Sequence, residues 1–312
     1  LQILYEILSE KTYVPGEDKV KEIHDPKDRI IMIAPFFPDR IIHHCVINVL
    51  SPFWTHIFIA NTYACIKGRG IQKCADDLGK ALMLDFAGTQ FCLKTDITKY
   101  YDHIDHAVLK AILRYTIDDE DLLELLFKII DSNGKNVGLP IGNFTSQYLA
   151  NIYLAYFDHW VKEELARMVK QKFGCKIYYF RYMDDMVFLA ETKEALQFVL
   201  DMAGLYLGAE LHVEFKHTWQ IFPVDDRSID FVGFKQNHYN ILLRKTILLK
   251  FYKKLEETQK HYLIKNEEDI KHLFPSEYGW IIKCSEQHKN FIFNKCINYG
   301  NIKTENRADL CR

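Results

Sequence analysis

The sequence predicts an α+β fold that is divided into more than one lobe. Of its 312 residues, 48% are hydrophobic and 14% aromatic, so the chain can bury a substantial core. Short apolar runs rich in aromatic and β-branched residues alternate with longer stretches whose apolar residues recur at helical spacing. From residue 240 onward, lysine and arginine outnumber the acids, although the whole chain has a formal net charge of −2. This change in composition sets the C-terminal region apart, although a solvated helical face explains a charge run equally well.

Composition also argues against some classes of protein. No run of about 18 or more apolar residues occurs, and the first residues lack the order of a secretion signal, so we expect a cytoplasmic protein without a membrane span. The eight cysteines form no Cys-x-x-Cys pair, which suits free thiols and argues against zinc. A net charge of −2 does not indicate nucleic-acid binding, so any such site must be a local patch. The sequence begins at Leu1 within a helix-like pattern, so we expect a further N-terminal piece.

The N-terminal elements are expected to begin with a short helix that should end by the proline and glycine of residues 14–16. Residues 22–34 then predict a β-hairpin that carries Lys27 and Arg29 near its tip. Taken alone, these two cations suit an ordinary solvated turn. Residues 39–50 have the apolar spacing of a helix.

A basic segment with two glycines, residues 63–70, precedes a helix expected over residues 71–83. Glycine lets the backbone approach a phosphate closely, and Lys67 and Arg69 carry the charge to neutralise one. The spacing is not that of a P-loop, so this indication of phosphate binding is weak.

Three aspartates stand at the ends of expected strands. An apolar strand over residues 91–97 carries Asp96, and an apolar hairpin over residues 177–190 has Asp184 and Asp185 at its tip. Aspartate is an ordinary turn residue, and for the hairpin alone this simple interpretation is preferred. Burying a bare carboxylate is expensive, however, so such acids need a partner, a cation or open water. Three carboxylates at strand ends are what a two-metal phosphoryl-transfer site requires, because Mg²⁺ favours carboxylate oxygen.

The other expected elements are mostly helices. Asp105 is expected to cap a helix over residues 106–115, and a second helix is expected over residues 119–130. After a loop rich in glycine, a long helix is expected from Thr145 or Ser146 to about residue 170. Further along, the pattern predicts a helix over 194–207, strands over 211–215 and 218–222, a tight turn within 229–234, and helices over 245–255 and around 278–280.

Four stretches of this sequence occur in the order found in reverse transcriptases. They are LKTDITKYY at residues 93–101, GLPIGNFTSQ at 138–147, FRYMDD at 180–185 and DFVGF at 230–234. The chain therefore resembles a reverse transcriptase over nearly its whole length.

The resemblance implies a right-hand polymerase fold with a ferredoxin-like palm. The fingers would span residues 1–88 and the palm residues 89–239, with a fingers insertion at about residues 106–138. Residues 240–312 would form a helical thumb.

The resemblance also assigns roles to matching positions. Asp96, Asp184 and Asp185, together with Ile97, would bind two Mg²⁺ ions, for which Mn²⁺ can substitute. Lys216 stands where the family has a lysine that can protonate the leaving pyrophosphate, so it joins the three aspartates as a catalytic residue.

Further positions match residues that bind nucleotide or nucleic acid in the resembled family. Arg29 and Lys27 would hold the incoming triphosphate, and Tyr101 would exclude a ribose 2′-OH. Ile141 and Gly142 would lie against the base being copied. Contacts with nucleic acid are expected from Lys67, Arg69, Phe231, Gly233, Lys250, Lys253 and Lys254.

One loop narrows the resemblance to a subgroup. Retroviral and intron enzymes have glutamine where this chain has Ile141, and intron enzymes usually have Ser-Pro where it has Ser146 and Gln147. The Ile-Gly-x-x-x-Ser-Gln sequence of this loop is similar to that of the reverse transcriptases of diversity-generating retroelements, which are encoded by bacteria or phages. Those enzymes copy a template RNA with errors at adenines, together with a small helical accessory protein. An isoleucine cannot test base-pair geometry by hydrogen bonding, which is a physical route to lower fidelity.

The resemblance implies dNTPs, a template RNA, an RNA/cDNA hybrid and the accessory protein as partners, and no membrane. Two alternatives stay open. A bacterial phage-defence reverse transcriptase has similar loops, and a scaffold of this fold could bind RNA without synthesis. Three mutually repelling carboxylates argue against the scaffold, because binding alone gives no reason to keep them together.

Overall fold

A four-stranded antiparallel sheet with the order β4–β5–β3–β6 forms the centre of the structure. This computed structural model describes residues 2–24 and 28–308, with side chains as far as residue 297. The predicted acidic hairpin is confirmed, because Tyr182 pairs with Asp185 and leaves Met183 and Asp184 as its turn. The strands are β3 (Phe91–Thr95), β4 (Ile177–Tyr182), β5 (Asp185–Ala190) and β6 (Gln220–Pro223).

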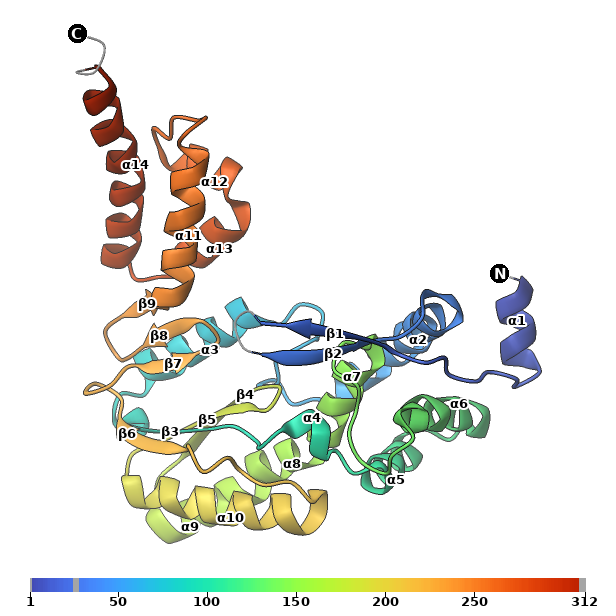
Figure 1. Ribbon diagram of the computed structural model, residues 1–312. Helices are drawn as coiled ribbons and strands as arrows, with labels where there is room; N and C mark the ends of the chain where they lie inside the picture. The colour runs from blue at the N-terminus through green and yellow to red at the C-terminus, as the bar shows by residue number, and fades with distance from the viewer. Residues whose placement is uncertain (1, 25–27, 309–312) are drawn as a thin grey trace.

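The two faces of this sheet bury alternate side chains against different partners. Leu93 and Phe188 belong to the large core that includes apolar residues of α10 (Lys193–Leu211). Cys92 and Val187 pack on the opposite face with residues of α3 (Ile71–Leu84). Figure 1 shows α9 and α10 beneath the sheet, with α3 and a smaller sheet above it.

The N-terminal region contains the second predicted hairpin, which is also confirmed. Ile23 at the end of β1 pairs with Arg29 at the start of β2, whereas Lys27 lies outside the described residues. The helix expected over residues 39–50 continues further, because Trp54 extends its buried face. The elements are α1 (Gln2–Ser9), β1 (Lys19–Ile23), β2 (Arg29–Ile33), η1 (Phe36–Arg40) and α2 (Ile41–Ile57).

Two helices begin at acidic caps, of which Asp105 was expected, whereas Asp119 was expected inside its helix and instead caps it. The Asp105 carboxylate accepts hydrogen bonds from the backbone N–H groups of residues 107 and 108, and Asp119 accepts one from residue 122. These helices are α5 (His106–Thr116) and α6 (Glu120–Ile130), accompanied by the shorter η2 (Ala87–Thr89), α4 (Tyr100–His103) and η3 (Asp131–Asn133).

The single long helix expected from residue 145 to about 170 is wrong in its start and its continuity. Thr145 and Ser146 are buried, and the helix begins one residue earlier. Leu154 (φ −96°, ψ 0°) interrupts the helix, and a π-helical segment follows further along. The successive segments therefore turn different sides toward the core. The segments are α7 (Phe144–Tyr153), α8 (Ala155–Trp160), η4 (Val161–Leu165) and α9 (Ala166–Phe173).

The strand expected over residues 211–215 is also wrong. Leu211 is still helical, because Leu207 and Leu211 both pack into the core, and α10 then ends at His212 in the left-handed conformation. Only Phe215 makes a bridge, opposite Ile97.

A three-stranded sheet, β7 (Ile229–Phe231), β8 (Phe234–Gln236) and β9 (Ile241–Leu243), connects the body to an upright column of helices (Figure 1). The column has its own apolar core, which includes Phe251 and Phe274. None of the described helices is long and apolar enough to span a membrane. The column consists of α11 (Lys245–Thr258), α12 (Glu267–Leu273), α13 (Pro275–Ile281) and α14 (Glu286–Ala308).

Candidate active site

A fully buried ion pair lies beneath the turn that carries Asp184. The side chains of Arg181 and Asp158 are both 0% exposed, and Nη2 of Arg181 lies 2.5 Å from Oδ2 of Asp158. The hydroxyl groups of Tyr179 and Thr62 donate to the same carboxylate, at 2.7 and 2.9 Å. A buried ion pair is tolerated only when such additional hydrogen bonds satisfy its remaining polar atoms.

The Arg181 guanidinium also holds the turn itself. Its Nη1 donates to the backbone oxygen of Met183 and to Oδ1 of Asn151, both at 3.0 Å. Met183 has a positive φ of 57°, a strained conformation for a residue other than glycine. The sequence analysis missed this network, although an arginine inside an apolar strand and an aspartate among helical core residues were visible signals.

The two aspartates of the hairpin tip have raised pKa values. Burial raises the pKa of Asp185 to about 6; Lys94 opposes the rise, whereas Asp184 and Asp96 add to it. Burial also raises the pKa of Asp184, with Asp96 adding to the rise and Arg29 opposing it. The three carboxylates therefore repel one another, as acids do when they share a site without a cation.

These acids suit a hard divalent cation in their chemistry, because carboxylate and carbonyl oxygens are the donors that Mg²⁺ prefers. Within the described part of the chain, no three histidine, cysteine or acidic side chains already converge as a metal cluster. The donor set, the carboxylates of Asp96, Asp184 and Asp185, is the feature in favour of a cation at this position.

A pocket of about 470 Å³ brings most of the expected nucleotide-binding residues together. Arg29 from β2 lines it, with Tyr101 from α4 and the turn residue Asp184. The sequence analysis had not assigned Lys99 or the other newly found lining residues to a nucleotide site. The lining residues are Arg29, Lys99, Tyr100, Tyr101, Asp102, Ile141, Gly142, Gln147, Tyr182, Met183, Asp184 and Asp185.

The glycine-rich loop holds the walls of this pocket together. The backbone oxygen of Ile141 accepts a hydrogen bond from the backbone N–H of Met32 at 2.7 Å. The backbone N–H of Leu139 donates to the backbone oxygen of Tyr101 at 2.8 Å. Gly142 has φ +121°, and a Cβ there would lie 2.6 Å from the Met32 oxygen. Only glycine allows β2 to approach this closely.

Tyr101 stands beside the acidic turn. Its hydroxyl lies 3.9 Å from Sδ of Met183, and burial raises its pKa, so the phenol is neutral at physiological pH. The ring packs edge-on against Tyr100, with 5.8 Å between the ring centroids. These contacts fix the ring as one wall of the pocket.

Asp96 is near the pocket but is absent from its lining. Nζ of Lys216 lies 3.4 Å from Oδ2 of Asp96. The backbone N–H of Lys216 also donates to the backbone oxygen of Asp96, at 2.8 Å. On the same side of β3, Nζ of Lys94 lies 4.0 Å from Oδ1 of Asp185 and donates to the Asp230 oxygen at 2.5 Å. Two lysines therefore place positive charge beside the catalytic candidates.

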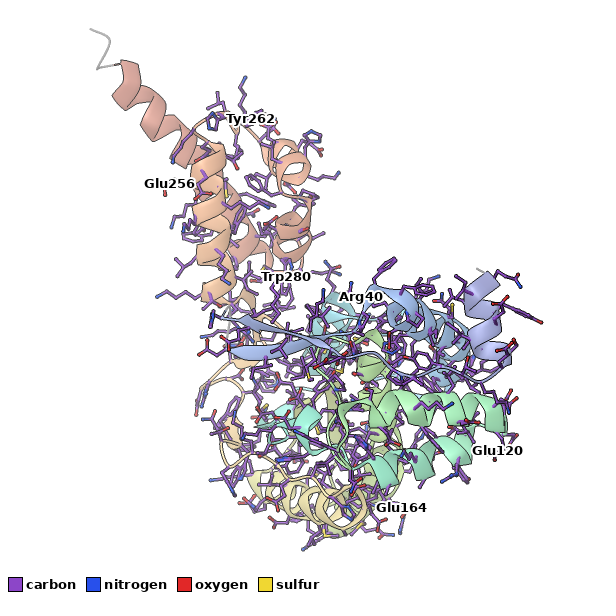
Figure 2. The ribbon with its side chains drawn as sticks, turned by 45° about the vertical axis from the view of Figure 1, so that its right-hand side comes forward. Arg40, Glu120, Glu164, Glu256, Tyr262 and Trp280 are labelled. Atoms are coloured by element: carbon purple, nitrogen blue, oxygen red, sulfur yellow. The ribbon has the colours of Figure 1, made fainter. Side chains whose placement is uncertain are left out.

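Two of the expected nucleic-acid contacts are corrected. The Phe231 side chain is fully buried, and Gly233 is buried beneath the helical column. A Cβ at Gly233 would lie 2.7 Å from Cη2 of Trp280, which Figure 2 shows at the foot of the column. Because Phe231 fills the core and Gly233 is covered, neither offers a free surface to nucleic acid.

The basic residues expected to contact nucleic acid differ in how far they are engaged. Arg69 donates from Nη1 to the backbone oxygens of Ile59 and Thr62, at 2.5 and 2.9 Å, so it holds the loop in which it lies. Lys254 donates to Glu277 at 2.8 Å. The side chains of Lys67, Lys250, Lys253 and Lys254 are all exposed, whereas that of Arg69 is half-buried.

Residues 23–235 match the protein family described as "Reverse transcriptase (RNA-dependent DNA polymerase)". Protein YkfC of Escherichia coli is 27% identical over 139 residues, which cover 41% of this chain and 36% of that protein. The group II intron-encoded protein LtrA of Lactococcus lactis is 26% identical over 135 residues, covering 41% of this chain and 22% of LtrA. The alignments thus span little more than a third of these curated relatives at most.

The fold is similar to that of solved telomerases. The structure of telomerase from Candida albicans with a fragment of telomeric RNA aligns with a TM-score of 0.57 at 14% identity, covering 96% of this chain and 68% of that one. The apo telomerase of Candida tropicalis aligns with a TM-score of 0.51 over 72% of this chain and 48% of that one. At this level of identity the likeness establishes the fold alone.

Proposed function

The chain belongs to the reverse transcriptase family, and on that premise we propose that it is an RNA-directed DNA polymerase. The observation that carries the proposal is the pocket in which Arg29, Tyr101 and the Asp184–Asp185 turn meet. Nucleotidyl transfer needs three kinds of group in one place: a cation that binds the triphosphate, a ring that lies beside the sugar, and carboxylates beside the reacting phosphate.

In this proposal, Asp96, Asp184, Asp185 and the backbone oxygen of Ile97 hold two Mg²⁺ ions. When bound, the ions would supply the charge that activates the attacking hydroxyl and stabilises the leaving pyrophosphate. Mn²⁺ has the same preference for carboxylate oxygen and can substitute.

The chain's own side chains orient the substrate. Arg29 pairs with the triphosphate, and Lys27 adds charge from the same hairpin. Tyr101 occupies the space that a ribose 2′-OH would need, so a deoxynucleotide is selected. The Lys216 ammonium, 3.4 Å from Asp96, carries a proton on Nζ that it can give to the departing pyrophosphate.

The proposed division into fingers (1–88), palm (89–239, with a fingers insertion at about 106–138) and thumb (240–312) follows from this function. The body then carries the chemistry, and the helical column stands beside the exit of the RNA/cDNA hybrid. The exposed Lys67, Lys250 and Lys253 are the proposed contacts with template RNA or hybrid.

We further propose that the enzyme copies template RNA inaccurately at adenine, as part of a diversity-generating retroelement with a small helical accessory protein. The support is Ile141, an apolar side chain that lines the pocket where a hydrogen-bonding residue could test the base pair. A bacterial phage-defence role is the alternative.

The test is primer extension by the purified chain on an RNA template with Mg²⁺ and dNTPs, followed by sequencing of the cDNA. We expect extension, and misincorporation concentrated opposite template adenine. One added hydrogen bond of about 1 kcal/mol changes discrimination roughly fivefold, so Ile141→Gln should lower the adenine error rate by that order. Errors spread evenly over four bases would exclude the inaccurate-copying proposal, and no extension would exclude the polymerase.

A further inference from the structure

The pocket contains a second cation to which the proposed function assigns no role. Lys99 lines it together with Arg29, Tyr101 and Asp184. The Lys99 side chain is exposed, and its ammonium has no hydrogen bond or ion pair with any other residue that the structure describes. Its charge is therefore available to a ligand in the pocket.

The backbone of Lys99 is strained. Its φ of 41° and ψ of 50° are left-handed, a conformation that glycine adopts without penalty and a residue with a Cβ does not. The turn imposes this conformation, because the Lys99 oxygen accepts a hydrogen bond from the Asp102 N–H at 2.9 Å where α4 begins. A glycine would satisfy the same turn at lower cost, so the lysine side chain needs a reason of its own.

Strain of this kind gathers around the pocket. Six residues other than glycine have positive φ in the part of the chain described, and Lys99 and Met183 both line this pocket. A third, Cys65, donates its thiol to Oε1 of Gln147, another lining residue, at 3.2 Å. Strained backbone persists at functional sites, where the surrounding structure holds it in place.

We propose that the Lys99 ammonium binds the triphosphate of the incoming nucleotide, opposite the Arg29 guanidinium on β2. This inference rests on the proposed function and assigns Lys99 as a substrate-binding residue. The charge balance favours it, because a triphosphate brings several negative charges into a pocket that is already lined by Asp102, Asp184 and Asp185. Two cations on different walls, at the β3–α4 turn and on β2, would fix the triphosphate between them.

The test compares Lys99→Gly and Lys99→Arg with the wild type in primer extension and in thermal unfolding. In Lys99→Gly we expect KM for dNTP to rise on the order of tenfold, with a smaller change in kcat, as for the loss of one charge-assisted contact. The melting temperature should stay equal or rise, because glycine relieves the strained turn. Lys99→Arg should keep KM close to the wild-type value.

Lys11→Gly is the matched control. Lys11 is also a lysine with positive φ, at 57°, but it lies outside the pocket and pairs with Asp121 at 2.5 Å. The same relief of backbone strain occurs there without a nearby triphosphate, so KM should not change.

Titration of inorganic tripolyphosphate in Mg²⁺ buffer separates this inference from the polymerase activity. The wild type should bind it more tightly than Lys99→Gly, by the same factor as the change in KM. Equal affinities, or a lower melting temperature in Lys99→Gly, would overturn the inference, since the lysine would then be unused or structural. If tripolyphosphate binds through Lys99 but no primer is extended, the proposed function fails and the triphosphate site stands.

Discussion

Two hairpin turns of this protein have the same two-residue length but opposite surroundings. In the first, Tyr182 pairs with Asp185 around Met183 and Asp184, and Met183 has φ 57°. In the second, Phe231 pairs with Phe234 around Val232 and Gly233, which have φ 42° and 89°. The first turn lines an open pocket, whereas Trp280 covers the second.

The difference between the turns lies in what supports them. Polar atoms hold the Met183–Asp184 turn from below, because Arg181 donates to the backbone oxygen of Met183 and is itself paired with Asp158. This leaves the upper side free for a ligand. The second turn is held by apolar contact, since Phe234 stacks on Trp280 with 5.1 Å between the centroids, and its Gly233 is covered while Val232 stays partly exposed. Motif resemblance marks both turns as functional, but the first lines a pocket, whereas Phe231 and Gly233 of the second are buried.

The largest expected effect comes from removing the support of the Met183–Asp184 turn. Asp158→Asn leaves the Arg181 charge buried without a counterion, so we expect unfolding free energy to fall by about 3–5 kcal/mol in urea titrations. Glu164→Gln is the control, because its pair with Arg167 is exposed and worth less than about 1 kcal/mol. Equal losses in the two variants would contradict the special role of the buried pair.

The second prediction tests the open side of the same turn. Asp184→Asn removes ligand charge at nearly constant shape, so primer extension should fall more than about a hundredfold, the equivalent of about 3 kcal/mol. Its melting temperature without metal should not fall, because repulsion with Asp96 is relieved. The exposed Asp201→Asn on α10 serves as the control, with activity unchanged. Near wild-type extension by Asp184→Asn would remove the catalytic assignment.

The third prediction concerns the covered turn. Gly233→Ala places a Cβ 2.7 Å from Trp280 and 2.8 Å from Cδ1 of Ile247, which should cost about 1–3 kcal/mol beyond the backbone strain. Gly134→Ala isolates that strain, because Gly134 also has positive φ, at 67°, but nothing lies within 4 Å of its added Cβ. Chemical denaturation of both variants gives the difference in unfolding free energy. Equal losses of unfolding free energy would mean that Trp280 moves aside at no cost in stability.

The smallest effect is expected on the helical column above the covered turn. Lys253→Ala should reduce the slope of log affinity for template–primer against log salt by about 1, as one phosphate contact is lost. Lys254→Ala should reduce it less, because Lys254 already pairs with Glu277. Unaltered slopes in both variants would mean that these lysines lie on an ordinary solvated face and do not contact nucleic acid.

The sequence by itself determined the local elements that carry the candidate site. The acidic hairpin follows from two apolar runs around Asp184 and Asp185, and the α5 cap follows from Asp105, because strand period and capping depend on neighbours in the chain. The family also follows from motif order, since each motif is contiguous and needs no partner elsewhere to be recognised.

Only the tertiary structure decided which residues meet. Arg181 and Asp158 are 23 positions apart, and nothing local pairs them; burial makes the pair necessary. The covered state of Gly233 depends on Trp280, and the role of Gly142 depends on the approach of β2. The expected strand over residues 211–215 failed for the same reason, because Leu211 completes a helix that packs on the sheet. Contacts between distant segments carry no periodicity in the sequence, so they emerge only when the chain is folded.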